Sequence, residues 1–167
     1  IAYRLNLPQP TVLIASTAGS AFDTVLDLRS SDCDATASEV ACHDDVSTSN
    51  STSRLTQTLP AGNYFLIVQG ADTSALGNYI LNVEKFAAEG VACSGSAQCG
   101  PGLVCRTPLG AAANVCSKPQ CADTLDDDAD GKNGYPTDPG CANLSDNDEA
   151  DPTPLPACSN GADDDND

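Results

Sequence analysis

Residues 59–70, LPAGNYFLIVQG, contain the clearest strand signal in the sequence. The apolar run from Tyr64 to Gln69 lies between two groups of turn-forming residues, 60–63 before it and 70–72 after it. Proline presets φ for a turn and glycine accepts positive φ, so both groups favour chain reversal. A short apolar run between two reversals predicts a strand of an antiparallel sheet.

The same arrangement recurs throughout residues 1–88, where short apolar runs alternate with turn residues. In the last run Tyr79, Leu81 and Val83 alternate with their neighbours, as expected of a strand with two different faces. No window combines helical periodicity with capping residues. The expected strands are 3–7, 12–15, 25–29, 55–59, 64–69 and 79–83. Strands of this length and spacing predict an all-β fold, an antiparallel β-sandwich or jelly roll.

Two cysteines lie within this predicted sandwich. Cys33 and Cys42 flank the short segment 34–41. A disulfide between them would contribute about 2–3 kcal/mol to a domain with a modest core, and we expect it to form.

Composition limits the compartment and the partners of the protein. The 167 residues include nine cysteines, one histidine and no methionine or tryptophan, a usage typical of secreted, disulfide-bearing proteins. The net charge of −17 argues against binding to nucleic acid or to an anionic membrane surface. No apolar stretch approaches the roughly 20 residues that span a bilayer. Because the sequence begins at Ile1 without a leader, we expect that an export signal has been removed.

The acidic residues are concentrated in one part of the chain. Residues 1–120 hold 10 acids and 6 bases, whereas residues 121–167 hold 14 acids and a single base, Lys132. The partners that such a segment attracts are cations.

The acidic segment contains an internal repeat. Superimposing Cys121 on Cys158 brings the first run of aspartates onto a second one. The first run, DDDADG at 126–131, places carboxylates at alternate positions ahead of a glycine, as in calcium-binding loops of the D-x-D-x-D-G type. The expected calcium ligands are Asp126, Asp128, Asp130, the carbonyl of Lys132 and Asp138, with Asp163, Asp165 and Asp167 in the second copy.

This segment has two other interpretations. Most acidic runs are solvated linkers, but the fixed spacing, the glycine, the repeat and the bracketing cysteines favour calcium. Carboxylates about 4 Å apart repel by roughly 1 kcal/mol even in water, so several of them in one loop require a counter-ion. Magnesium is less suited because it demands a tighter octahedron and loses water reluctantly.

The first half of the chain also resembles a known family. GSAFDTVLDLRSSDC at 19–33, EVACHDD at 39–45, residues 59–70 and GNYILNV at 77–83 are similar to the pre-peptidase C-terminal (PPC) domain of bacteria. That resemblance implies a small β-sandwich of the kind found at the ends of secreted proteases and surface proteins. Members usually have one more strand ahead of the strand expected at 3–7.

The rest of the chain resembles two further kinds of module. Residues 89–120 have four cysteines, which allow three pairings from spacing alone. A zinc site is the rival interpretation, but no C-x2-C spacing or histidine is near. Similarity to small cysteine-rich secreted modules implies the bridges Cys93–Cys105 and Cys99–Cys116.

Residues 121–167 are similar to thrombospondin type 3 repeats and to D-x-D-x-D-G…DPGC repeats of bacterial surface proteins. This resemblance implies a Cys121–Cys141 bridge. It also implies that Asp146, Asp148 and Glu149 complete the first site or form another.

Weaker candidates lie in the sandwich. Asp23, Asp44 and Asp45 would be structural turn residues on the family resemblance, or would hold a calcium ion of their own. His43 has no serine or cysteine nucleophile in a recognisable setting, and 4% aromatic residues leave little to line a substrate pocket. A Ser/Thr-rich stretch at 47–58 is expected to be an exposed loop that could carry glycan.

These features predict a non-enzymatic, extracellular calcium-binding structural protein, for example a self-assembling subunit of a bacterial surface filament or matrix. The incomplete second repeat and the unmatched Cys158 indicate either trimming of a longer chain or assembly, in which a neighbour donates a strand or ligands. The alternative is an adhesive or accessory binding module of a larger secreted hydrolase or surface protein.

Overall fold

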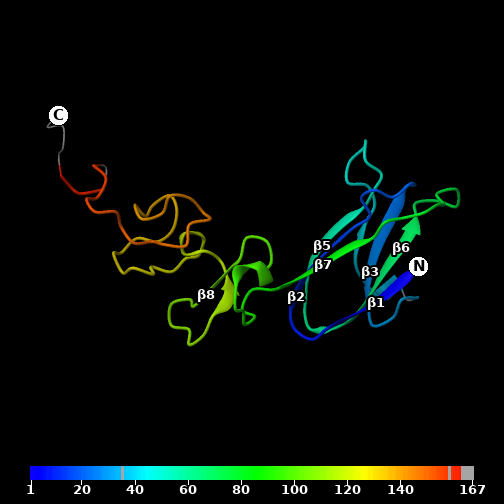
Figure 1. Ribbon diagram of the computed structural model, residues 1–167, viewed down its shortest axis with the longest axis horizontal. Helices are drawn as coiled ribbons and strands as arrows, with labels where there is room; N and C mark the ends of the chain where they lie inside the picture. Colours follow the sequence, from blue (N-terminus) through cyan, green and yellow to red (C-terminus); the bar gives the residue numbers. More distant parts are fainter. Residues whose placement is uncertain (35, 158, 163–167) are drawn as a thin grey trace. The chain divides into compact units, whose positions relative to one another are not determined.

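A computed structural model describes residues 1–34, 36–157 and 159–162. The chain divides into two compact units, with the boundary at Val91 and Ala92 (Figure 1). The second unit contains both the cysteine-rich stretch and the described part of the acidic segment. Among the described residues, no helix has the length and apolarity to cross a membrane.

The first unit consists of two antiparallel sheets. One sheet has the order β1 (Ala2–Leu7), β6 (Gly62–Gly70), β3 (Thr24–Ser30), β4 (Glu39–His43). The other has the order β5 (Arg54–Leu59), β2 (Thr11–Ser16), β7 (Asn82–Ala87). The predicted all-β class is therefore confirmed.

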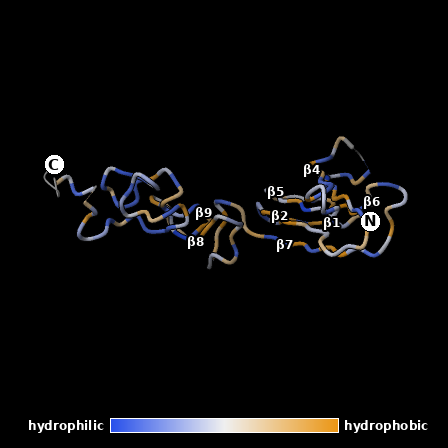
Figure 2. Tube along the Cα trace, turned by 90° about the horizontal axis from the view of Figure 1, so that it is seen from above, coloured by the Kyte–Doolittle hydropathy of each residue, from blue (hydrophilic) through white to orange (hydrophobic). Residues whose placement is uncertain are grey.

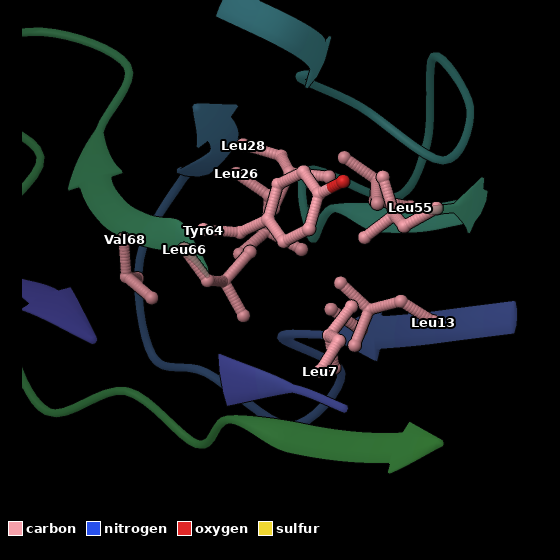
Figure 3. Close-up of a cluster of buried hydrophobic side chains, with 10 residues drawn as sticks. Leu7, Leu13, Leu26, Leu28, Leu55, Tyr64, Leu66 and Val68 are labelled. Atoms are coloured by element: carbon pink, nitrogen blue, oxygen red, sulfur yellow. The ribbon is translucent and has the colours of Figure 1, made fainter. Parts of the chain in front are cut away.

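The core lies between these sheets. Alternate residues of β6, Tyr64, Leu66 and Val68, are buried together with leucines of β2, β3 and β5, and Figure 3 shows these side chains pointing toward one another. The period of two that the sequence shows at 64–69 is thus the period of burial. The turn ahead of β6 is fixed by Tyr64, whose hydroxyl donates to the carbonyl of Pro60 over 3.1 Å.

The strand expected at 79–83 begins later than predicted. Strand β7 pairs with β2 from Asn82 onward, opposite Ser16, where β2 ends. The backbone before Asn82 therefore has no strand to pair with, and the N–H of Ile80 donates instead to the hydroxyl of Ser20 over 3.0 Å. Tyr79 and Leu81 nevertheless pack on the core. The alternation reported the packing of Tyr79 and Leu81 correctly, but Val83 is 37% exposed, and a strand was the wrong conclusion for 79–81.

The predicted Cys33–Cys42 disulfide is wrong, because both cysteines are free. Cys42 lies opposite Asp27 in the β3–β4 ladder, whereas Cys33 lies beyond the end of β3. Strand β4 runs from Glu39 away from the turn, and three residues of strand extend about 10 Å. A disulfide needs Cα atoms within about 7 Å, so the hairpin itself separates these thiols.

The second unit is held together by disulfides. A short hairpin of β8 (Val104–Arg106) and β9 (Val115–Ser117) is its only sheet among the described residues. The bridges are Cys93–Cys105, Cys99–Cys116 and Cys121–Cys141, the three pairings that the resemblances implied. The buried apolar residues here are cysteines, and Figure 2 shows a largely hydrophilic trace over the acidic segment.

Candidate metal centre

The aspartates at 126, 128 and 130 form one compact loop. Each offers a carboxylate oxygen such that the three oxygens lie within 4.8 Å of one another. The loop turns sharply because Ala129 and Gly131 adopt positive φ, 65° and 90° respectively. Positive φ is uncommon for alanine, whereas glycine adopts it freely.

Each of these three carboxylates holds the loop with one oxygen. Asp126 Oδ2 accepts from the N–H of Gly131 (3.0 Å), Asp128 Oδ1 from that of Asp130 (3.2 Å), and Asp130 Oδ1 from that of Lys132 (2.7 Å). The second oxygen of Asp126, Oδ1, is buried without a hydrogen-bond partner. One oxygen of each carboxylate thus orders the loop backbone, and the second oxygen accepts no backbone hydrogen bond in the loop.

Asp138 contributes a second buried and unpaired oxygen. The residue is only 2% exposed, and its Oδ1 accepts from the N–H of Gly140 over 2.7 Å. Its Oδ2 is buried and has no hydrogen-bond partner. A buried carboxylate without a counter-charge costs several kcal/mol, a cost that a cation near this oxygen would offset.

Asp151 is a candidate that the sequence analysis missed. Its Oδ1 is buried without a partner. This burial raises the pKa of Asp151, and the negative charges of Asp130, Asp138 and Asp128 raise it further, whereas Lys132 opposes the shift. Asp151 lies outside the repeated aspartate run, next to the proline-rich linker, so no spacing rule marked it.

Glu149, a predicted ligand, supports the loop backbone. It is 1% exposed, and its two oxygens accept from the N–H of Asp127 (2.8 Å) and from that of Gly134 (3.0 Å). Gly140 lets the Glu149 backbone approach, since a Cβ at position 140 would lie 1.8 Å from the Glu149 carbonyl oxygen. The Cys121–Cys141 disulfide links the chain just before the aspartate loop to the residue that follows Gly140.

Two other acids of the region are neutralised by arginine. Arg106, at the end of β8, is 8% exposed and forms a salt bridge with Asp123. A second guanidinium nitrogen lies 3.6 Å from Asp127 Oδ2. The Arg106 Nε also donates to the carbonyl of Lys118 over 2.8 Å. Of the carboxylates that remain around the loop, Asp130 is paired with the partly exposed Lys132 ammonium, 3.4 Å away.

The other predicted ligands of this region have different settings. Asp146 Oδ2 accepts from the N–H of Ala142 (3.2 Å) and Asp148 Oδ1 from that of Ala150 (3.0 Å). Within the described part of the chain, Asp146, Asp148 and Asp151 belong to no close group of ligand atoms, and Asp138 groups with Cys141 and Glu149 rather than with the aspartates at 126, 128 and 130. The predicted second-copy ligands Asp163, Asp165 and Asp167, and Cys158, lie outside the described residues.

Asp23, Asp44 and Asp45 also come together, with ligand atoms within 4.8 Å of one another. Asp23 Oδ1 is buried without a partner. Burial raises the pKa of Asp23, and the charges of Asp45, Asp44 and Asp72 raise it further. The group lies at the loops around β3 and β4, where Asp23 precedes β3 and the other two follow β4.

Searches of family models, of curated proteins and of solved structures found no match to this chain.

Proposed function

We propose that this chain is a non-enzymatic, extracellular calcium-binding structural protein whose acidic loop binds Ca²⁺. The observation that carries the proposal is the set of buried, unpaired carboxylate oxygens on Asp126, Asp138 and Asp151 around that loop. Calcium takes six to eight hard oxygens in flexible geometry. The carboxylates of 126, 128, 130 and 138 and the carbonyl of Lys132 are the proposed ligands.

Secretion is part of this proposal. The three disulfides of the second unit are compatible with an oxidising compartment, where such bridges persist. Millimolar calcium outside cells would occupy even a weak site. Calcium and disulfides would together stabilise a unit that has little apolar core.

The proposed function also includes self-association of the chain into a surface filament or matrix. Strands β1, β4, β5 and β7 are edges in their sheets, and edges with unpaired backbone groups can accept a strand from another chain. Tyr3 on β1 is 39% exposed, and Ile1, just before the strand, is 70% exposed.

The alternative is an accessory binding module of a larger secreted protein, with the PPC-like sandwich as the binding domain. It is favoured by the independence of the sandwich, which has its own core and forms a separate unit.

The calcium proposal is tested on the full chain by limited trypsin digestion. Lys132 follows the aspartate loop directly, so cleavage after it reports loop opening. With calcium a hundredfold above its Kd, cleavage after Lys132 should slow about a hundredfold relative to chelated protein. Samples are reduced before mass analysis because Cys121–Cys141 would hold the two fragments together.

The matched variant is Asp128→Asn, which retains an oxygen for the N–H of Asp130 and removes the charge. It should lose the protection by calcium, and cleavage after Lys85 in the sandwich serves as the internal reference. Equal cleavage of wild-type protein after Lys132 with calcium and with chelator would contradict the calcium proposal.

Electron microscopy of native material with and without chelator tests assembly. Smooth monomers insensitive to chelation would contradict the proposed self-association.

A further inference from the structure

We propose that Asp151, which follows the Cys121–Cys141 bridge in the sequence, is a further calcium ligand of the loop site. The inference rests on the proposed function and adds a ligand that the loop motif does not contain. It joins the aspartate loop to the residue from which the segment Pro152–Pro156 departs.

The geometric basis of the proposal is that certain buried carboxylate oxygens have no hydrogen-bond partner. Asp138, 2% exposed, has a buried and unpaired Oδ2, and Asp151 has a buried and unpaired Oδ1. Asp146 and Asp148, in the same stretch of chain, each bind a backbone N–H, and neither has such an orphaned buried oxygen. Asp151 is thus distinguished from its acidic neighbours by an oxygen withdrawn from water and left without a donor.

The electrostatic basis is the set of charges around Asp151. The negative charges of Asp130, Asp138 and Asp128 all act unfavourably on an ionised Asp151 carboxylate. Lys132 opposes them, but its ammonium is already 3.4 Å from Asp130. A divalent cation among these groups would reverse the sign of the interaction from repulsion to attraction.

The backbone two residues before Asp151 is held beside the loop by direct contacts. Glu149 binds the N–H groups of Asp127 and Gly134, and Gly140 packs against the Glu149 backbone. The ligand would therefore be delivered by a preordered segment, which lowers the entropy cost of binding.

The test is calorimetric calcium titration of the full chain and of two variants, Asp151→Asn and Asp148→Asn. Both variants remove one negative charge from the same stretch. Asp151→Asn should weaken calcium binding at least about tenfold, the loss expected for a group at a metal site, whereas Asp148→Asn should stay close to wild type. In chelator, Asp151→Asn should unfold at a higher denaturant concentration than wild type, because a repelled charge is removed.

If Asp151 is a ligand, its replacement weakens calcium binding and stabilises the calcium-free protein. If Asp151 is only a structural residue, its replacement lowers both the calcium affinity and the stability of the calcium-free protein. Equal affinities for the two variants would overturn the role of Asp151 while leaving the loop site intact. Absence of binding by wild-type protein at millimolar calcium would overturn the proposed function itself.

Discussion

At the scale of single residues, the acidic segment contains carboxylates with three different tasks. Asp123 and Asp127 lie beside Arg106, Glu149 binds backbone N–H groups, and Asp126, Asp138 and Asp151 retain buried oxygens without partners. Sequence spacing identifies residues 126–130 because alternate side chains of one loop converge locally. It could not assign Glu149, whose role depends on hydrogen bonds to the N–H groups of Asp127 and Gly134, and it did not mark Asp151, which lies outside the repeated aspartates.

The buried Glu149 gives a prediction at this scale. Replacing it with glutamine puts an amide NH2 in place of one oxygen, so a buried backbone N–H loses its acceptor. We expect Glu149→Gln to lower the free energy of unfolding by about 1–3 kcal/mol. Denaturant unfolding in chelator measures it, and Glu89→Gln, at an exposed position, is the control. Equal losses for the two variants would refute the role given to Glu149.

At the scale of elements, the sequence predicts well the strands that have a clear apolar run, including the central β2, β3 and β6 and the edge strands β1 and β5. Strand β6 is central in its sheet and alternates clearly, so its pattern and its turns both identify it. Strand β4 is an edge strand with two residues intermediate and three exposed, and it was not predicted as a strand. The same limit applies to 79–81, where packing produced alternation without a ladder.

Leu66 on β6 gives the matching prediction. It has no exposed surface and lies within the leucine cluster between the sheets. Leu66→Ala should lower the free energy of unfolding of the sandwich by about 2–5 kcal/mol, since it leaves a cavity in a small core. Chemical denaturation followed by tyrosine fluorescence measures the change. Leu144→Ala, at a side chain 59% exposed in the other unit, should have little effect. A similarly small loss for Leu66→Ala would argue against the core described for this sandwich.

At the scale of the whole molecule, the two units depend on different forces. The sandwich has a leucine core and both of its cysteines are free, whereas the described bridges all lie in the second unit. Each bridge closes a loop of 12 to 20 residues and contributes about 3 kcal/mol in the chain-entropy model. Reduction should therefore act on one unit only.

Hydrogen exchange followed by mass spectrometry can measure this difference. After reduction in the presence of chelator, amides of residues 92–157 should exchange faster, while those of β2, β3 and β6 keep their protection. Loss of protection in the sandwich on reduction would mean that its stability depends on the second unit. Adding calcium to oxidised protein should slow exchange in residues 126–138.

The approach of Gly140 to Glu149 also defines how this module can be recognised elsewhere. Position 140 admits no side chain, positions 121 and 141 must bond, and position 149 must reach two N–H groups of the loop. Together with the aspartates these requirements give the pattern C-x4-D-x-D-x-D-G-x8-G-C-x7-E-x-D over residues 121–151. An acid-rich tail of the same composition but without that spacing would not form the contacts that order this loop.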